Sequence, residues 1–333
     1  ANLFAQRRTD GMVRDCHGDL RLDHVHITDE QVCIFDCIEF NDRFRYVDIA
    51  ADVAFLAMDL DHKGRPDLAA RLVSRLAEEL DDPGLLEVLT FYKTYRAVVR
   101  AKVAAMKSVE DEVPEEERAD SAEEARSYVR LATNYVATGD RPTAIVVMGR
   151  IATGKSTQAR MLGYACGWRV VSSDITRKRL AGLPVLQRPN DETRAELYSA
   201  RVSADVYAEI VRQAATELEA GHSVVVDATF SRRSDRDRLR AALGAIRSPA
   251  SRPAMHRFIE ITSPEERVRE RLRQREYQTG ISSDARLADY DIINESYEPL
   301  DREELLSSVT VSSSNGPDET HRQILSLLAE RCR

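Results

Sequence analysis

Residues 144–156 read AIVVMGRIATGKS, an apolar run that passes directly into a glycine-bounded loop and a lysine. The run Ala144–Met148 has the length and β-branched composition of a buried strand. The loop after it matches the pattern G-x-x-x-x-G-K-[ST] in full from Gly149 to Ser156. A strand, this loop and a helix-forming stretch in succession predict a phosphate-binding P-loop. The simpler alternative is a glycine turn with an exposed lysine.

Each part of this loop has a physical reason to bind phosphate. Glycines allow backbone conformations in which successive N–H groups point at one anion, and the following helix directs its positive end to the same place. Lys155 would add a charge at the β- and γ-phosphates of ATP, and the Ser156 hydroxyl is a suitable Mg²⁺ ligand. The predicted nucleotide-binding residues are Gly149, Arg150, Ile151, Ala152, Thr153, Gly154, Lys155, Ser156 and Thr157.

The sequence around and after the loop alternates between strand-sized and helix-sized segments. Strands are expected at 144–148, 169–172, 223–226, 257–261 and 309–312. Helices are expected at 155–164, 191–220, 234–245, 264–274 and 318–331. This alternation predicts a three-layer α/β domain with a parallel sheet, over residues 143–333.

The first part of the chain follows a different, mostly helical pattern. Helices are expected at 46–59, 66–80, 85–106 and 118–136. The stretch Gln31–Cys37 reads as a buried strand, with Val25–Thr28 as its hairpin partner. Turn-forming residues at 138–142 (TGDRP) separate the two patterns. We therefore expect a mostly α-helical domain over residues 1–138 before the P-loop domain.

Two aspartates stand at the ends of predicted strands beside the loop. Asp174 follows the strand at 169–172, and Asp227 follows the strand at 223–226. Because strand carboxyl ends converge on the ligand crevice, Asp174 could accept a proton from an attacking hydroxyl, and Asp227 could hold Mg²⁺. Each could instead cap a helix N-terminus. We expect the substrate to be bound by Arg177, Arg232 and Arg236.

A predicted helix near the end of the chain is rich in arginine and leads into a loop at 278–283. Its arginines are Arg267, Arg269, Arg271, Arg273 and Arg275. Surface ion pairs with the glutamates of the same helix would explain most of them. Phosphoryl transfer, however, needs a movable cation over the γ-phosphoryl group, and this helix and loop are suited to act as a lid. Arg271 and Arg275, one turn apart, are the candidates.

The composition of the chain excludes several classes of protein. The chain has 333 residues, a net charge of −8 and 43% hydrophobic residues, so it can form packed cores and is not disordered. No apolar run reaches the length of a membrane span, and no secretory leader is visible. Five cysteines without a CxxC pair are typical of a reducing cytosol, and we expect a cytoplasmic protein. The acidic balance argues against a general nucleic-acid partner.

The second domain resembles a known group of enzymes. Residues 143–333 resemble small P-loop kinases related to zeta toxins and polynucleotide kinases, through GRIATGKS, SSDITRK, VVVDATF and RLRQR. The resemblance implies transfer of the γ-phosphoryl group of Mg-ATP to a hydroxyl of a small molecule, with Asp174 as the general base. The acceptor stays open. So do two alternatives, an ATP-binding regulatory module and a kinase of polynucleotide ends, for which the arginine-rich segment 232–240 leaves room.

The first domain carries a second resemblance. Cys16-His17-Gly18-Asp19-Leu20, followed by IFDCIE at 34–39, resembles the catalytic core of aminoglycoside phosphotransferases, which have the protein-kinase fold. That resemblance implies Asp19 as the base and Asp36 as a metal ligand. His24 stands where the family has an asparagine, and no lysine precedes His17. We therefore expect a kinase-like C-lobe without its upstream lobe, catalytically silent in this chain: a fragment of a longer bifunctional phosphotransferase/ATP-binding protein, or else a remnant scaffold.

Overall fold

The computed structural model describes residues 2–139, 141–247, 254–277 and 283–330 of the chain. The chain divides into two compact units, Ala1–Asp140 and Arg141–Arg333. Each unit has its own hydrophobic clusters, and we describe each by itself. Within the described ranges, no helix combines the length and the apolarity that crossing a membrane requires.

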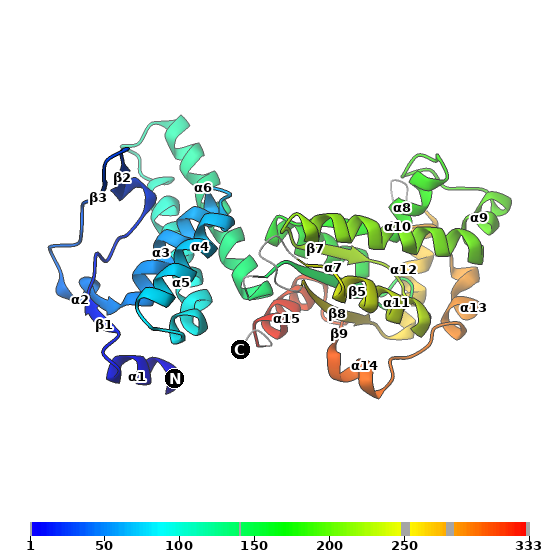
Figure 1. The fold of residues 1–333 in the computed structure, drawn as a ribbon. Helices are drawn as coiled ribbons and strands as arrows, with labels where there is room; N and C mark the ends of the chain where they lie inside the picture. Colours follow the sequence, from blue (N-terminus) through cyan, green and yellow to red (C-terminus); the bar gives the residue numbers. More distant parts are fainter. Residues whose placement is uncertain (1, 140, 248–253, 278–282, 331–333) are drawn as a thin grey trace. The chain divides into compact units, whose positions relative to one another are not determined.

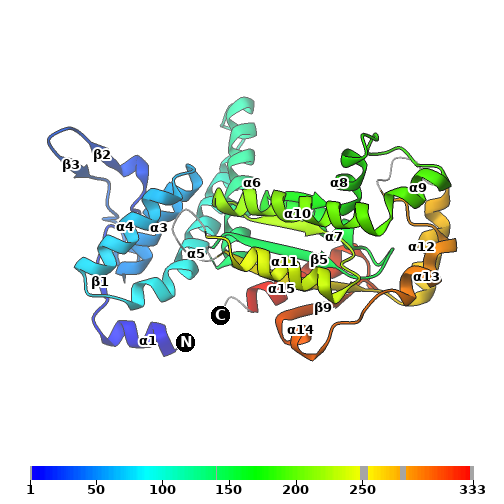
Figure 2. The same cartoon turned by 45° about the vertical axis from the view of Figure 1, so that its right-hand side comes forward.

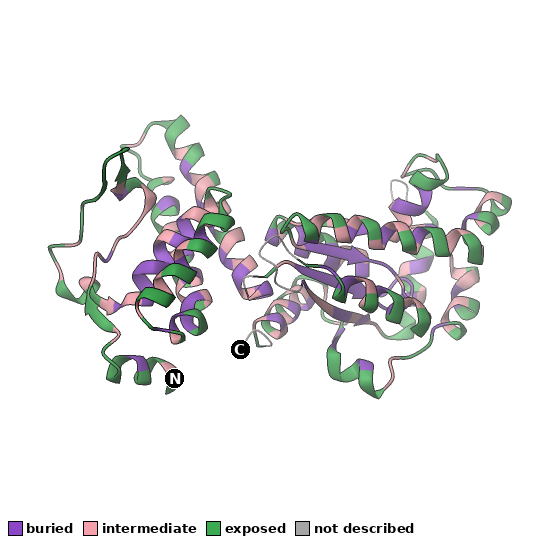
Figure 3. Ribbon diagram, in the orientation of Figure 1, coloured by how far each residue is buried: buried purple, intermediate pink, exposed green. Residues whose placement is uncertain are grey.

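The second unit is built on a five-stranded sheet in which every neighbouring pair is parallel (Figure 1). The strand order is β6-β7-β5-β8-β9. The strands are β5 (Thr143–Met148), β6 (Arg169–Ser172), β7 (Val224–Asp227), β8 (Met255–Thr262) and β9 (Ser308–Ser312). β5 lies at the centre and is buried throughout, which is why its sequence is a continuous apolar run rather than an alternating one (Figure 3).

Helices cover this sheet, as the strand–helix alternation predicts (Figure 2). Ala144, Val146 and Met148 of β5 share one cluster with apolar side chains of α10 (Ala200–Glu219) and α11 (Arg233–Gly244). Helix α7 (Lys155–Cys166) packs against β5, β6 and β7, and α15 (Pro317–Glu330) packs against α7 and β9. The remaining helices are α8 (Ser173–Leu180), α9 (Asp191–Leu197), α12 (Glu265–Glu276), α13 (Tyr290–Glu295), α14 (Arg302–Ser307) and the short η2 (Leu287–Asp289). The predicted α/β fold class is confirmed.

Two features of this unit differ from the sequence expectation. The single helix expected at 191–220 is two helices, because the Ser199 side chain accepts a hydrogen bond from the Val202 amide and starts α10 anew. Helix α14 was not expected. Its start is nevertheless readable in the sequence, since Asp301 and Glu304 form a reciprocal capping box.

The first unit is mostly helical, with two small two-stranded antiparallel sheets. Its long helices are α3 (Ile49–His62), α4 (Pro66–Glu79), α5 (Gly84–Lys107) and α6 (Glu115–Thr138). Its shorter elements are α1 (Asn2–Thr9), β1 (Val13–Asp15), η1 (Leu22–His24), β2 (Val25–Ile27), β3 (Val32–Ile34), α2 (Asp42–Arg45) and β4 (Tyr46–Asp48). Strand β1 pairs with β4, and β2 pairs with β3.

Two expectations for the first unit are wrong. The stretch Gln31–Cys37 is not a buried strand: β3 covers three of its residues and is exposed, with Val32 at 62% and Ile34 at 52%. The helix expected from Tyr46 begins three residues later, because Tyr46–Asp48 pairs with β1 and the Asp48 carboxylate accepts from the Ala50 amide. The buried Arg7 guanidinium then holds Asp48 at 2.7 Å and Asp82 at 2.8 Å.

Candidate active site

The predicted P-loop joins the end of β5 to the start of α7. Gly149 has φ +130° and Gly154 has φ +104°, backbone regions in which a side chain is strained. A Cβ at Gly149 would also meet the Ile261 carbonyl oxygen at 2.4 Å. No side chain caps the N-terminus of α7, so its first amides have no side-chain acceptor. The loop therefore has the backbone form and the helix terminus that suit a phosphate group.

Lys155 folds back over this loop. Its ammonium donates to the Arg150 carbonyl oxygen at 2.5 Å, and the residue is 9% exposed. Burial lowers the pKa of Lys155 to about 8, and the negative charges of Asp227 and Asp174 oppose that shift. The predicted phosphate-binding lysine is thus a buried cation beside two carboxylates, which contradicts the alternative of a glycine turn with an exposed lysine.

The two aspartates lie at neighbouring strand ends, as expected. Ser172 at the end of β6 is the register partner of Asp227, and Asp174 lies two residues further, in the first turn of α8. Neither aspartate is an N-cap: Ser172 precedes α8, and Arg232 precedes α11. The helix-cap alternative is therefore wrong for both.

The electrostatics of the pair follow from burial. Burial raises the pKa of Asp174 and of Asp227, while the Lys155 ammonium lowers both. The negative charge of Asp227 adds to the upward shift at Asp174. The hydroxyls of Ser156 and Ser172 donate to the Asp227 carboxylate and favour its charged form. The site thus concentrates negative charge that a cation would stabilise.

This donor set fits a magnesium ion. Among the described residues, no cluster of three or more His, Cys, Asp or Glu side chains could hold a metal. The oxygen donors here are instead the Asp227 carboxylate and the Ser156 hydroxyl, with Asp174 nearby. Mg²⁺ prefers oxygen and usually takes few protein ligands, with waters and phosphate oxygens completing its shell. The residues present therefore suit Mg²⁺ bound together with a nucleotide.

A cleft of about 670 Å³ opens in front of these groups. The P-loop, α8–α10, the start of α11 and residues 283–296 form its walls. Its volume lies in the range of small-ligand and cofactor sites. Its cationic lining residues are Lys155, Arg177, Arg194, Arg232, Arg238 and Arg275, and its acidic ones are Asp174, Asp191, Asp227, Asp235 and Asp289.

The two candidate arginines of α12 have different surroundings. Arg275 lines the cleft, where burial lowers the pKa of its guanidinium and Asp174 opposes that shift. Arg271 is not among the cleft-lining residues; it donates to the Ala152 carbonyl oxygen at 3.2 Å and to Ser313 Oγ at 3.1 Å. Arg271 thus contacts the P-loop backbone, and the roles of Arg271 and Arg275 over the γ-phosphoryl group stay predictions; residues 278–282 of the expected lid loop lie outside the described residues. Arg269 forms the expected surface ion pair with Glu265.

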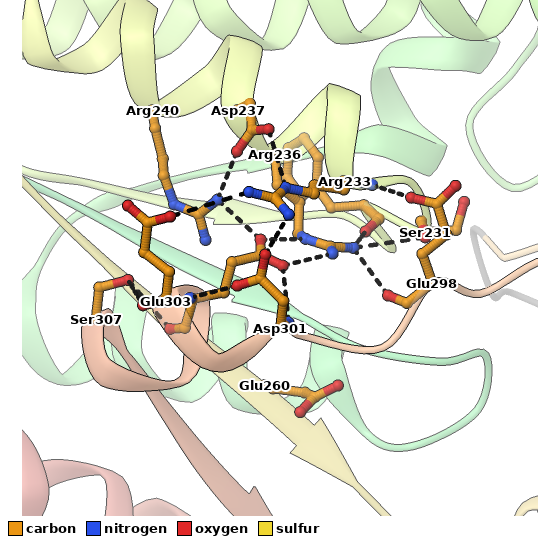
Figure 4. Close-up of polar contacts among 12 residues, drawn as sticks. Ser231, Arg233, Arg236, Asp237, Arg240, Glu260, Glu298, Asp301, Glu303 and Ser307 are labelled. Carbon is orange, nitrogen blue, oxygen red and sulfur yellow. Dashed lines mark hydrogen bonds and ion pairs between the residues drawn. The ribbon is translucent and has the colours of Figure 1, made fainter.

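The three arginines expected to bind the substrate differ in whether they line the cleft. Arg177 and Arg232 line the cleft. Arg177 donates to the Leu197 carbonyl oxygen at 2.5 Å and lies 4.4 Å from the centroid of the Tyr198 ring. Arg236 is a correction: it is fully buried, and its guanidinium holds both carboxylate oxygens of Glu304 (Figure 4). Its guanidinium nitrogens all donate to buried or main-chain acceptors of the protein and are not accessible from the cleft, so Arg236 is a structural residue.

Some cleft residues were missed by the sequence reasoning. The Tyr198 hydroxyl donates to Asp174 Oδ1 at 3.5 Å, and Arg194 pairs with Asp289 across 95 residues of sequence. Tyr207 stacks on Phe230 in the wall behind them. None of these residues belongs to a motif. A capping signal at Ser199 would have placed Tyr198 at a helix end, but not beside Asp174.

The HGD loop of the first unit is held in place by the start of α3. The Asp52 carboxylate accepts from the amides of His17 at 2.8 Å and Gly18 at 2.9 Å. His24 lies between the two predicted functional carboxylates, with Nδ1 3.7 Å from Asp19 Oδ2 and Nε2 3.4 Å from Asp36 Oδ2.

The partners of these two carboxylates are nitrogen groups. Arg21 Nε donates to Asp19 Oδ2 at 3.2 Å. His24 Nε2 is the neighbour of Asp36 Oδ2, and the Asp36 side chain is 72% exposed. In the described part of the unit, Asp19 and Asp36 are not joined by a third carboxylate or thiol in a metal-binding cluster. The roles of Asp19 as base and Asp36 as metal ligand stay predictions.

Comparison with known families gives one match for the first unit and another for the second. The profile of the phosphotransferase enzyme family matches residues 1–88, and that of the AAA domain family matches residues 145–300. The chain joins a phosphotransferase-family segment to a P-loop kinase domain. Both resemblances noted in the sequence are thereby confirmed.

Individual relatives cover different parts of the chain. An uncharacterized protein of Mycobacterium tuberculosis is 36% identical over 228 residues, which are 68% of this chain and 44% of that protein. The chain thus spans less than half the length of this curated relative. The P-loop kinase domain is similar to a gluconokinase from Sinorhizobium meliloti (24% identity, 57% and 94% of the two chains, TM-score 0.39) and a shikimate kinase from Acinetobacter baumannii (14%, 60% and 98%, 0.40).

Proposed function

We propose that the P-loop kinase domain transfers the γ-phosphoryl group of ATP to a hydroxyl of a small molecule, with Mg²⁺ as its metal. One observation carries the proposal: the P-loop lysine Lys155, the half-buried Asp174 and the buried Asp227 border one cleft of about 670 Å³. A phosphate cradle, a base candidate and a metal-ligand candidate are thus brought to the same space, which is the set of parts that phosphoryl transfer requires.

The proposed reaction assigns a role to each charged group. The acceptor oxygen attacks the γ-phosphorus while Asp174 takes the hydroxyl proton, and the bond from the γ-phosphorus to the bridging oxygen breaks to release ADP. The raised pKa of Asp174 makes it a stronger base than an ordinary aspartate. Lys155 and Arg275, which both line the cleft, would stabilise charge that develops on the phosphoryl oxygens. Mg²⁺, held by Ser156 and Asp227, would neutralise phosphate charge.

The cleft walls favour a small acceptor. Arg177 and Arg232 offer cationic groups for a polar or anionic acceptor. The same walls carry five acidic residues beside six cationic ones, so they do not form the strongly cationic channel that the phosphate backbone of a polynucleotide requires. A polynucleotide-end kinase is therefore the weaker alternative, and excess short oligonucleotides should not compete with turnover.

The proposal is tested by measuring ATP consumption in the presence of a library of hydroxyl-bearing metabolites. We expect one acceptor class to stimulate turnover in the wild-type chain and not in Lys155→Ala. Lys63→Ala removes an exposed lysine of the other unit by the same substitution and should leave turnover unchanged. If Lys155→Ala binds and consumes ATP as the wild type does, the P-loop assignment fails.

A second substitution separates a kinase from an ATP-binding regulatory module. In a kinase, Asp174→Asn lowers turnover by about 10²–10⁴-fold because the base is lost, and ATP affinity changes only a few-fold. In a regulatory module the same variant would keep both ATP binding and every response to it. Isothermal titration with ATP and Mg²⁺ measures the affinity, and phosphate transfer to the acceptor measures turnover.

A further inference from the structure

A fully buried ion pair lies one helical turn from the proposed base. Lys178 Nζ is 3.0 Å from Asp284 Oδ1, and their side chains are 1% and 3% exposed. Lys178 follows Asp174 by four residues on α8, so both extend from the same side of this helix. Burying two charges is costly unless further hydrogen bonds satisfy them. The phosphate site and the proposed reaction use neither residue, so the pair needs another explanation.

The remaining contacts of the Lys178 ammonium provide one. It donates to the Val185 carbonyl oxygen at 3.2 Å and to the Gln187 carbonyl oxygen at 2.9 Å. The ammonium thus donates two hydrogen bonds to one segment of the chain and forms an ion pair with Asp284 of another. We name these segments the post-α8 loop (183–191) and the cleft-rim segment (283–289). A single side chain therefore ties both segments to the helix that carries Asp174.

Three arginines add contacts between the same parts of the chain. Arg188 donates to the Glu276 carbonyl oxygen at 3.0 Å, at the end of α12. Arg286 donates to the Pro189 carbonyl oxygen at 3.3 Å and pairs with Asp191. Arg194, just after the post-α8 loop, pairs with Asp289 of the cleft-rim segment. The side chains of the ion pairs Arg194–Asp289 and Arg286–Asp191 are partly exposed, whereas those of Lys178 and Asp284 are buried, and a buried charged contact resists competition from water.

Both segments form cleft wall. Asp191 of the post-α8 loop lines the cleft, as do Ser283, Ala285 and Asp289 of the cleft-rim segment. Arg275 also lines the cleft, and its own carbonyl oxygen accepts from Arg188. The contacts of Lys178 join this wall to α8, the helix that carries Asp174.

We propose that Lys178 is a positioning residue: its buried ammonium couples the post-α8 loop to the cleft-rim segment and so fixes the wall of the cleft, with Arg275, relative to Asp174. The catalytic part of this inference rests on the proposed kinase function. The coupling itself does not, because it concerns the folded protein alone.

Amide hydrogen exchange of the full chain tests the coupling without any activity. In the wild type, the amides of Leu183 and Gln187 report on the loop, and those of Arg286 and Asp289 report on the rim, since all four are hydrogen-bonded. Lys178→Met should raise exchange in both segments by about tenfold or more, because hydrogen bonds to a charged group are lost. Arg179→Met, at the exposed neighbouring position of α8, is the matched control and should leave both segments at wild-type rates. Faster exchange in the loop alone, or equal effects of the two variants, would overturn the proposal.

A second variant covers the case in which Lys178→Met does not fold. Asp284→Asn keeps the lysine and its two carbonyl contacts but removes the charge that holds the rim. Because coupling between two segments is reciprocal, exchange should rise in the loop as well as in the rim. A rise confined to the rim would overturn the proposal.

The kinetic consequence is measured separately. With an acceptor in hand, Lys178→Met should lower kcat by about 10–100-fold through misplacement of the cleft wall, while ATP affinity stays within about twofold, because the P-loop is not touched. Lys178→Arg, which keeps a cation, should recover part of kcat. If the wild type has no phosphotransferase activity, the proposed function fails while the exchange experiment still decides the coupling. If kcat of Lys178→Met equals that of the wild type, the positioning role fails.

Discussion

Replacing Arg236 by methionine should destabilise the P-loop kinase domain strongly. The Arg236 guanidinium donates to Glu304 Oε1 at 2.7 Å and to Oε2 at 2.8 Å, and its third nitrogen meets the carbonyl oxygens of Phe230 at 3.0 Å and Glu298 at 3.1 Å (Figure 4). Methionine fills much of the same volume but donates none of these bonds. Glu304 would keep Arg240, at 2.8 Å, as a charged partner.

The size of the effect follows from the acidity of Glu304. Burial raises the pKa of Glu304, but hydrogen bonds from Arg236 and Arg240 outweigh it and hold the pKa at about 2, against an ordinary 4.5. The difference is about 2.5 units, and at 1.36 kcal/mol per unit it corresponds to about 3 kcal/mol of folding free energy. Removing one partner of a buried ion pair costs about 3–5 kcal/mol in measured cases. We therefore expect Arg236→Met to lose about 3 kcal/mol at pH 7.

The depressed pKa of Glu304 determines how the stability difference between the two proteins changes with pH. A carboxyl group with a depressed pKa stabilises the folded state above its unfolded pKa, and this contribution disappears as the pH falls through the folded pKa. For Glu304 the window runs from about pH 4.5 down to about pH 2. The stability difference between the wild type and Arg236→Met should thus be largest near neutral pH and should narrow across this window.

Urea unfolding followed by tryptophan fluorescence is a suitable assay. The chain has a single tryptophan, Trp168, which precedes β6 and so reports on this domain. Arg238→Met, whose side chain is 78% exposed and pairs with Asp235 at 3.9 Å, is the matched control and should cost less than about 0.5 kcal/mol. A loss below about 1 kcal/mol for Arg236→Met, or a gap that stays constant between pH 7 and pH 3, would refute the reasoning.

Two other predictions follow from buried charges. Because the pKa of Lys155 is lowered to about 8, the ammonium loses its charge above pH 8. ATP affinity should therefore be constant below pH 8 and fall by up to about tenfold per pH unit above it. Fluorescence titration with ATP from about pH 7 to 9.5 measures this affinity, and Lys155→Ala should remove its pH dependence. Arg7→Met should lower the free energy of unfolding of the first unit by about 3–5 kcal/mol, because the buried carboxylates of Asp48 and Asp82 lose their shared arginine. Calorimetry would detect this loss as a lower transition temperature, and an unchanged transition temperature would contradict the prediction. Arg8→Met, at an exposed position of the same helix, is the control.

Much of the fold is encoded in local sequence patterns. The run Ala144–Met148 predicts a buried strand, because five consecutive apolar residues suit a strand with both faces covered, and β5 is indeed the central strand of the sheet. The P-loop follows from the positions of Gly149, Gly154 and Lys155, since these spacings suit one backbone form. That Asp174 and Asp227 lie together follows from the rule that parallel strands end on one edge.

Other features needed the tertiary structure. Arg232 and Arg236 are one helical turn apart, yet one lines the cleft and the other is buried against Glu304, 68 residues away. Arg271 and Arg275 divide in the same way between the P-loop backbone and the cleft. Sequence periodicity indicates which face of a helix a residue occupies, but not which distant segment packs there.

The same division separates what the sequence determined about this protein from what the fold decided. The sequence by itself determined the α/β architecture, the phosphate cradle and the two aspartates, because each depends on backbone conformation and spacing over a few residues. The fold decided which arginines face the cleft, and it brought Lys178 to Asp284 across 106 residues. A long-range partner is selected by the packing of the whole chain, and its identity leaves no trace in the local pattern around either residue.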